Sequence, residues 1–137
     1  MAELVQYSNG VPALRFRIDR QIMRIGRSAD NNDVCILDSH VSKEHAVIEV
    51  RASRTNPDLA EFYIRDLGST NHTYVNKQEI RNHKLQNDDM IYIGQHMFRF
   101  VCADKESIKG LTGEEETLEF EKKQFNRSFS RRLRMIY

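Results

Sequence analysis

The chain has 137 residues, of which 39% are hydrophobic and 30% charged, so it is sized for one globular domain with an appended tail and is too hydrophobic for a disordered chain. Its 21 basic and 20 acidic residues nearly cancel. The net charge of the chain therefore gives no reason to expect a nucleic-acid partner. No apolar run approaches the roughly 20 residues of a membrane helix, and no basic segment followed by an apolar one opens the chain, which indicates a cytoplasmic or nuclear protein.

Short runs rich in Val, Ile, Tyr and Phe alternate with polar turns from residue 4 to residue 102. In chain order, the runs that predict strands are 4–8, 13–18, 21–26, 34–37, 46–52, 61–67, 73–76, 78–80, 90–94 and 97–102. The alternation of apolar and polar side chains is clearest at 62–65, where Phe62 and Ile64 point to one face and the residues between and after them point to the other. The pattern predicts an all-β fold, with a two-layer β-sandwich as the first architecture.

The turns between these runs carry Asn and Asp where hairpins often use Gly. Residues 71–72, 76–77 and 87–88 each predict a tight turn, because Asn tolerates a positive φ. The longest insertion, residues 51–61, is polar and contains a proline, so it predicts an exposed hairpin loop with no chemistry of its own.

Two cysteines, Cys35 and Cys102, both lie in apolar strand-like runs. A reduced thiol in such a run behaves as a small buried hydrophobe, and we prefer this interpretation to a disulfide or a metal ligand. No metal site and no cofactor are predicted. The sequence has no HExxH, CxxC or GxSxG pattern, so catalysis is not predicted either.

The composition changes after Cys102, which predicts a boundary between a domain at 1–103 and a charged extension at 104–137. Residues 104–121 contain two basic and seven acidic side chains, whereas residues 122–137 contain six basic side chains and none that is acidic. Such asymmetry is typical of a tail that makes interactions.

The extension also has a helical hydrophobic pattern. The apolar residues that fall on one face of a helix are Leu118, Phe125, Phe129, Leu133 and Ile136. The spacing predicts an amphipathic helix whose polar side is basic. Such a helix either covers an open edge of the sandwich or binds a partner or a membrane surface.

Three short motifs occur in order, each at a predicted turn: IGRS at 25–28, VSKEHA at 41–46 and GSTNHT at 68–73. Each is weak alone. Together, with strand-like runs between them, they resemble the forkhead-associated (FHA) domain, whose pattern is GR, then SxxH, then a small polar turn ending in NGT. The similarity covers roughly Gln21 to Val101.

The resemblance implies a β-sandwich of about eleven strands that binds phosphothreonine peptides through loops at one end. Arg27, Ser42, Lys43 and Thr70 match the positions that contact the phosphate, and Asn71 matches the asparagine that holds the peptide backbone. A phosphate carries about 1.5 to 2 negative charges and three acceptor oxygens, so an arginine fork with neutral donors suits it.

Other motif positions imply supporting and selective roles. The structural positions of the family are matched by Gly26, His45 and Gly68. Ser39 and His40 lie in the segment that helps the family to read the third residue after the phosphothreonine, where His40 would favour an acidic or polar side chain. His72 replaces the usual glycine, so it either donates to the ligand when protonated or points to solvent.

The sequence therefore predicts a non-catalytic signalling or scaffold module for phosphothreonine-containing partner proteins, with no nucleic acid expected. One alternative is self-association driven by phosphorylation of Thr112 or Thr117 in the acidic segment. A second is a sandwich that assembles with partners independently of phosphate. Contact of the basic residues at 122–134 with anionic lipid is a further possible role, and it is compatible with phosphothreonine binding by the sandwich.

Overall fold

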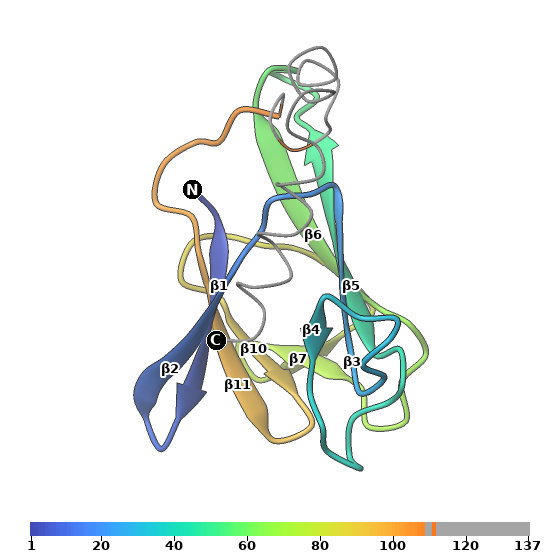
Figure 1. The fold of residues 1–137 in the computed structure, drawn as a ribbon. Helices are drawn as coiled ribbons and strands as arrows, with labels where there is room; N and C mark the ends of the chain where they lie inside the picture. The colour runs from blue at the N-terminus through green and yellow to red at the C-terminus, as the bar shows by residue number, and fades with distance from the viewer. Residues whose placement is uncertain (109–110, 112–137) are drawn as a thin grey trace, which may run out of the picture.

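The computed structural model of the chain describes residues 1–108 and Leu111. This part contains eleven strands in two sheets (Figure 1). The strands are β1 (Glu3–Ser8), β2 (Val11–Arg17), β3 (Ile22–Gly26), β4 (Val34–Cys35), β5 (Ala46–Ala52), β6 (Ala60–Asp66), β7 (Thr73–Val75), β8 (Gln78–Ile80), β9 (Asn82–Lys84), β10 (Met90–Ile93) and β11 (His96–Val101). The all-β prediction is confirmed.

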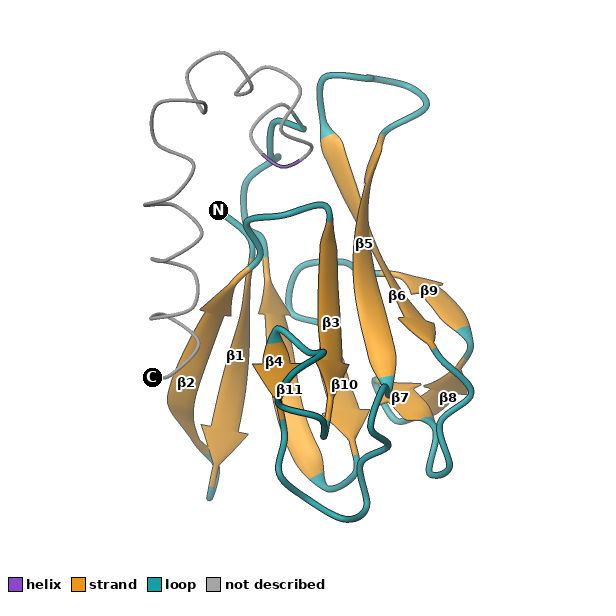
Figure 2. Ribbon diagram, turned by 45° about the vertical axis from the view of Figure 1, so that its right-hand side comes forward, coloured by secondary structure: helices purple, strands orange, loops and turns teal. Residues whose placement is uncertain are grey.

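The two sheets lie face to face as a sandwich (Figure 2). One has the strand order β2-β1-β11-β10-β7-β8, and the other has the order β4-β3-β5-β6-β9. Every pairing between neighbouring strands is antiparallel except that of β3 with the short β4, which is parallel. Because the chain changes sheets repeatedly, loops that are distant in sequence meet at one end of the sandwich.

Alternating side chains from both sheets form the core. Phe98 and Phe100 of β11 and Ile64 of β6 are at most 1% exposed, as period-two alternation requires. The rings of Phe62 and Phe100, which come from different sheets, lie 5.3 Å apart and join the two layers. Buried aromatic pairs of this kind contribute beyond their area alone, so they hold the scaffold under the loops rigidly.

The loop between β5 and β6 lies at the end opposite the β4–β5 and β6–β7 loops (Figure 1). Leu59 forms an isolated antiparallel bridge with Ser107, and the Ala60 amide donates to the Glu106 carbonyl at 2.7 Å. Leu111 is only 8% exposed and belongs to the hydrophobic core. The packed structure therefore continues through the described residues after 103.

Three details of the sequence prediction differ from the structure. Strand β9 was not predicted, because its residues are polar and it joins the sheet through backbone pairing with β6. The run at 34–37 forms a strand only at Val34–Cys35, after which Leu37 is 84% exposed. Cys35 is exposed and Cys102 partly buried, and both are free thiols, so the expectation of two buried cysteines holds for neither fully.

Two of the three predicted tight turns use positive φ at a different residue from the one expected. Asn76 and Lys77, with φ of 50° and 70°, form the two-residue turn between β7 and β8 as predicted. In the other two turns the second residue carries the strain, because His72 and Asp88 have φ of 66° and 73°. Asn71 is thereby left with an ordinary backbone and a side chain that can bind.

The amphipathic pattern, Thr112, Thr117 and the basic residues of the extension lie outside the described residues. Among the residues that the structure describes, no helix has the length and apolar character needed to span a bilayer.

Candidate anion-binding site

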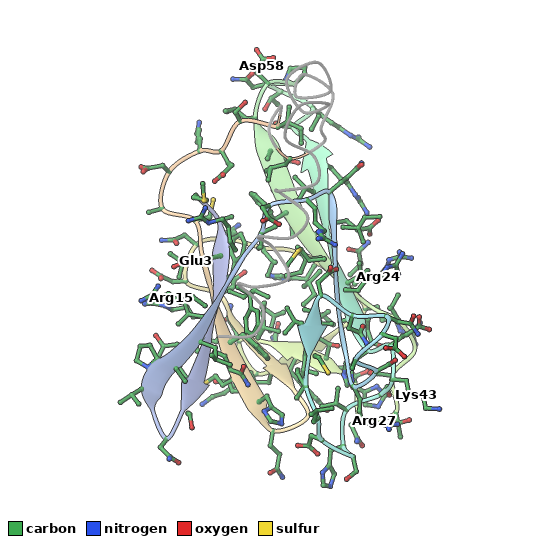
Figure 3. All side chains as sticks on the ribbon, in the orientation of Figure 1. Glu3, Arg15, Arg24, Arg27, Lys43 and Asp58 are labelled. Atoms are coloured by element: carbon green, nitrogen blue, oxygen red, sulfur yellow. The ribbon has the colours of Figure 1, made fainter. Side chains whose placement is uncertain are left out.

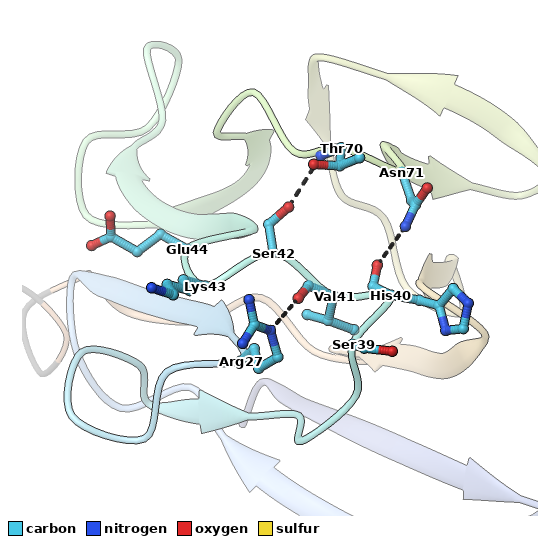
Figure 4. Close-up of a pocket in the computed structure, with 9 residues that line it drawn as sticks. All are labelled: Arg27, Ser39, His40, Val41, Ser42, Lys43, Glu44, Thr70 and Asn71. Atoms are coloured by element: carbon cyan, nitrogen blue, oxygen red, sulfur yellow. Dashed lines mark hydrogen bonds between the residues drawn. The ribbon is translucent and has the colours of Figure 1, made fainter.

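Three loops meet at the end of the sandwich opposite the β5–β6 loop and enclose an open pocket of about 390 Å³ (Figure 4). They are the segment after β3, the segment between β4 and β5, and the turn between β6 and β7. The lining residues are Arg27, Ser39, His40, Val41, Ser42, Lys43, Glu44, Thr70 and Asn71. All four residues predicted to contact the phosphate therefore line one pocket. The predicted peptide-binding residue Asn71 and the predicted specificity residues Ser39 and His40 line it too, whereas His72 does not.

Arg27 follows the last residue of β3 and is partly buried. Its backbone amide donates to the Ser42 carbonyl at 2.9 Å, and its side-chain Nε donates to the Val41 carbonyl at 2.9 Å. The two terminal guanidinium nitrogens have no hydrogen-bond partner within the described part of the chain. They form a fixed fork of donors at the pocket, which matches the oxygens of a carboxylate or phosphate.

Ser42 and Thr70 lie next to each other in the wall of the pocket (Figure 4). The Thr70 amide donates to Ser42 Oγ at 3.1 Å, so this hydroxyl oxygen already accepts one hydrogen bond. The Ser42 hydroxyl hydrogen is then available to donate to a bound anion. The same contact joins the β4–β5 loop to the β6–β7 turn.

Asn71 also links the two loops. Its Nδ2 donates to the His40 carbonyl at 2.8 Å, which orients the amide group and leaves Oδ1 as an acceptor. An acceptor oxygen beside an anion site can receive a backbone N–H from an extended ligand. The contact therefore preserves the part of the side chain that a peptide would use.

Lys43 and Glu44 give the rim of the pocket charges of opposite sign, and both side chains are exposed. Figure 3 shows Lys43 and Arg27 at the same end of the molecule. The Glu44 carboxylate extends away from Arg27 in the close-up (Figure 4). The centre of the pocket is consequently cationic. Glu44, the acidic residue of the lining, was not predicted as a binding residue and lies at the edge.

Gly26 allows the β3 end to approach the β4–β5 loop closely. A Cβ added at Gly26 would lie 2.3 Å from the Lys43 carbonyl oxygen and 2.8 Å from Nδ2 of Asn32. Asn32 itself bridges the loops, because Nδ2 donates to the Lys43 carbonyl at 2.7 Å. Only glycine fits between these groups without displacing backbone.

His45 is completely buried and connects the loops from beneath the pocket. The Ser42 amide donates to its Nδ1 at 3.1 Å, so Nδ1 is an acceptor and the proton lies on Nε2. Nε2 then donates to the His72 carbonyl at 2.8 Å. Because both ring nitrogens bond to backbone groups, His45 positions the two loops and has no free nitrogen for a bound ligand.

Asp66 organises the β6–β7 turn, although sequence reasoning gave it no role. Its Oδ1 accepts the hydroxyl hydrogens of Ser69 at 2.5 Å and Thr73 at 2.8 Å. Its Oδ2 accepts the amides of Gly68 at 2.9 Å and Ser69 at 3.0 Å, where Gly68 has a φ of 75°. Burial opposes ionisation, but these hydrogen bonds outweigh it and lower the pKa of Asp66.

The lowered pKa of Asp66 predicts acid sensitivity. Because its folded pKa lies below the unfolded value of about 3.9, the ionised group stabilises the fold above about pH 4, and this stability is lost as pH falls through the folded pKa. We expect Asp66→Asn to be less stable at pH 7 and to show a shallower loss of unfolding free energy between pH 4 and 2. Urea titrations at several pH values measure this. Parallel pH profiles for the two proteins would contradict it.

Asp38 is a second carboxylate that sequence reasoning missed. Its Oδ1 accepts the His40 amide at 2.8 Å and lies 3.0 Å from His40 Nδ1, while Oδ2 lies 2.8 Å from Nε2 of His96. The His40 amide, the His96 ring and the His40 ring lower the pKa of Asp38 to about 2. The carboxylate is thus ionised at physiological pH and anchors the loop that carries Ser39.

His72 lies beside the turn and outside the pocket. Its Nδ1 is 3.5 Å from a carboxylate oxygen of Glu79 on β8, and both side chains are half exposed. Its contribution to the site is the backbone carbonyl that His45 binds. No group of three or more His, Cys, Asp or Glu side chains within residues 1–108 and Leu111 is arranged to hold a metal ion.

Comparison with known proteins gives one family. The model of the FHA domain matches residues 23–94. Among curated proteins, the glycogen accumulation regulator GarA of Mycobacterium tuberculosis is 33% identical over 92 residues, which are 67% of this chain and 52% of GarA. The chain therefore spans about half the length of this relative.

Solved structures give the same result. EmbR of Mycobacterium tuberculosis, in complex with a low-affinity phosphopeptide, is 31% identical with a TM-score of 0.60, covering 73% of this chain and 24% of EmbR. The FHA domain of the CT664 protein from Chlamydia trachomatis is 21% identical with a TM-score of 0.66, covering 75% of this chain and 98% of that domain. The second likeness concerns the fold alone.

Proposed function

This chain belongs to the FHA domain family, and from that premise we propose that it is a non-catalytic signalling module whose pocket binds phosphothreonine-containing segments of partner proteins. The observation that carries the proposal is the convergence of the Arg27 fork and the Ser42 hydroxyl in one cationic pocket. EmbR, a 31% identical protein of the same fold, is described in complex with a phosphopeptide, which supports this ligand class.

The pocket suits a phosphate better than a carboxylate. Arg27 offers two terminal donors, and the Ser42 hydroxyl offers one from the adjoining loop. Lys43 at the rim adds a second positive charge, and the Thr70 hydroxyl adds a further donor. A phosphate has three terminal oxygens and nearly two negative charges, so it can engage these groups at once.

The ligand backbone would lie against Asn71. Its Oδ1 is the acceptor left after Nδ2 has bonded to the His40 carbonyl, so it can receive an N–H next to the phosphothreonine. Ser39 and His40 continue the pocket wall and would contact side chains further along the peptide. Gly26 and His45 hold the loops that carry these groups, and Gly68, with its φ of 75°, shapes the β6–β7 turn.

The geometry also argues against catalysis by Ser42. A nucleophilic serine needs a base within hydrogen-bonding reach of its hydroxyl. The neighbouring histidine, His45, instead accepts the Ser42 amide through Nδ1 and bonds the His72 carbonyl through Nε2. The hydroxyl is consequently a donor to ligand, which favours a binding module over a hydrolase.

The decisive test of the proposal compares binding of oriented peptide libraries that carry phosphothreonine, phosphoserine or unphosphorylated threonine. We expect measurable binding only with a phosphate, and stronger binding with phosphothreonine. Fluorescence anisotropy with individual peptides then gives dissociation constants, and added inorganic phosphate should compete. Equal affinity for phosphorylated and unphosphorylated peptides would refute the proposal and favour a phosphate-independent assembly module.

Replacing His72 with glycine tests whether this unusual residue touches the ligand. Because its ring faces Glu79 and lies outside the pocket, we expect the phosphopeptide dissociation constant of His72→Gly to stay within about twofold of the unmodified protein. Its positive φ of 66° suits glycine, so stability should not fall appreciably. A tenfold loss of affinity would instead place the imidazole on the ligand.

We propose that the domain predicted at 1–103 carries the binding function in the cytoplasm, and that the described residues of the charged extension predicted at 104–137 pack against this domain as far as Leu111. Because Leu111 packs into the core, a truncated chain for binding studies should end after that residue. Self-association through phosphorylated Thr112 or Thr117, and lipid contact by the basic segment, stay predictions. Comparing the oligomeric state and vesicle binding of the full and truncated chains tests both.

A further inference from the structure

The outer faces of the two sheets carry different kinds of side chain. On the outer face of the sheet that contains β5, β6 and β9, Glu49 lies 3.4 Å from Arg51 and 3.3 Å from Arg65. Lys84 of β9 lies 3.0 Å from Glu61 of β6 on the same face. Opposite charges are thus paired across neighbouring strands, which is the ordinary surface of a sheet that faces water.

The outer face of the other sheet carries a row of large apolar side chains instead. Tyr7 of β1 lies directly opposite Met97 of β11, which lies opposite Tyr92 of β10. Tyr92 lies in turn opposite Tyr74 of β7, and Tyr74 lies opposite Glu79 of β8. Because residues opposite each other share a face, these side chains form one continuous row, here called the tyrosine row, with Glu79 at its end. The row crosses five strands and is partly exposed.

The polar tips of the tyrosine row are unused. On the other outer face, the Tyr63 hydroxyl donates to Glu61 at 2.9 Å. The hydroxyl groups of Tyr7, Tyr74 and Tyr92 make no hydrogen bond anywhere in the portion of the chain that the structure describes. Tyrosine and methionine are enriched in protein interfaces, where a phenol ring supplies apolar contact area and its hydroxyl bonds to the partner. The row therefore has the composition of a contact surface for another protein.

The charges on this face indicate what that protein is. Arg15 and Arg17 lie on the outer face of β2, at one edge of the sheet, whereas Glu79 lies on β8 at the opposite edge. Between the two edges, Arg99 is 3.5 Å from Asp88. A face with a single sign of charge would repel its own copy, but this face is mixed, and its two edges have opposite signs. It is complementary to itself.

We propose that the tyrosine row is the contact between two copies of this chain, related by a twofold axis that runs parallel to the strands. Rotation about this axis places β2 of each copy against β8 of the other, so Arg15 meets Glu79 twice. An axis across the strands would bring β2 against β2, and the arginines would repel each other. One nitrogen of Arg15 bonds to Glu3 at 2.6 Å, which leaves its remaining donors for Glu79.

The direction of the axis has a consequence for the anion site. Rotation about an axis parallel to the strands leaves both copies pointing the same way, so the two pockets open at the same end of the dimer. A partner with two phosphothreonines can then occupy both pockets, and its second contact forms at a high effective concentration. This consequence rests on the proposed phosphopeptide function, whereas the dimer itself does not.

Sedimentation equilibrium of the full, unphosphorylated chain tests the dimer without any ligand. Mass spectrometry first establishes that no residue is phosphorylated, which separates this contact from association through Thr112 or Thr117. We expect the apparent mass to rise from 16.1 kDa towards twice that value as the protein concentration increases. A mass that stays at 16.1 kDa up to a concentration of about 1 mM would overturn the proposal.

Variants test the position of the contact. Tyr92→Lys places a charge at the centre of the row and should weaken dimerisation by at least about tenfold, because that charge loses water in the interface. Tyr63→Lys makes the same change on the other outer face and should alter dimerisation by less than about twofold. Equal effects of the two substitutions would overturn the proposal. Melting temperatures confirm that each variant is folded.

A charge exchange tests the direction of the axis. Arg15→Glu and Glu79→Arg should each weaken dimerisation, since each places like charges opposite each other. The double variant restores the attraction and should dimerise like the unmodified chain. A double variant that dimerises more weakly than both single variants would overturn the parallel axis.

Peptide binding separates the dimer from the proposed function. A peptide with one phosphothreonine should bind Tyr92→Lys as tightly as the unmodified chain, because the row shares no residue with the pocket. Peptides with two phosphothreonines on flexible linkers of graded length should bind the unmodified dimer at least about tenfold more tightly and lose this advantage in Tyr92→Lys. A dimer that binds no phosphopeptide would refute the proposed function alone, and a monomer that binds one would refute the dimer alone.

Discussion

Arg27→Ala is expected to weaken phosphothreonine-peptide binding by at least about 100-fold with little change in fold. The two terminal nitrogens would donate charge-assisted hydrogen bonds, each contributing roughly 1.5 to 3 kcal/mol, and a tenfold change in affinity corresponds to about 1.4 kcal/mol. Within the protein the substitution removes only the side-chain bond to the Val41 carbonyl. Anisotropy titration and thermal unfolding measure the two effects separately.

Two matched variants sharpen this test. Arg27→Lys keeps the charge but loses the fork, so we expect an intermediate loss of roughly tenfold. Arg24→Ala removes an exposed arginine three residues earlier, on the outer face of β3 and outside the pocket (Figure 3), and should change affinity by less than about twofold. If the Arg27 and Arg24 variants lost affinity equally, the anion would be bound by overall charge and not at this pocket.

Gly26→Ala is expected to lower the free energy of unfolding by about 1 to 3 kcal/mol and to weaken ligand binding by tenfold or more. Overpacking in a tight site costs this much because neighbouring atoms must move. The obstructing atom is the Lys43 backbone oxygen, 2.3 Å from the new Cβ, so relief requires the β4–β5 loop to move away from β3. That movement separates Arg27 from Ser42. Urea unfolding and peptide titration measure both losses.

Gly10→Ala is the matched control, since it lies in the turn between β1 and β2 and shares no contact with the pocket. An added Cβ there meets nothing within 4 Å, but the φ of 80° strains any other residue. We expect lower stability with unchanged affinity. If Gly26→Ala also kept its affinity, the close approach of the two loops would matter only for folding.

The strands that form the core were predictable because alternation and burial follow the same period. Phe62 and Ile64 of β6 face inward as their spacing indicates. Strand β9 could not be found in this way, since none of its side chains enters the core and its place depends on backbone pairing with β6. The Asn9-Gly10 pair is a further local hairpin signal, and both residues have positive φ in the turn between β1 and β2.

The pocket residues were identified from the motifs, but their supports were not. Asp66 and Asp38 look like ordinary turn residues, and their hydrogen-bond partners on other strands become neighbours only after folding. A weak local signal existed, because Asp side chains often accept amides two residues further on, as both do here. The role of His96 follows from the pairing of distant strands, which no local pattern indicates.

The hydrogen bonds between the loops have a consequence for the timing of binding. Thr70 and Ser42, Asn71 and His40, and the buried His45 are already bonded across the loops without ligand. No segment of the pocket then has to fold around an arriving peptide, so association should proceed at an ordinary rate of about 10⁵ to 10⁷ M⁻¹s⁻¹ for every phosphorylated ligand. Strong and weak partners would differ in how long they stay bound.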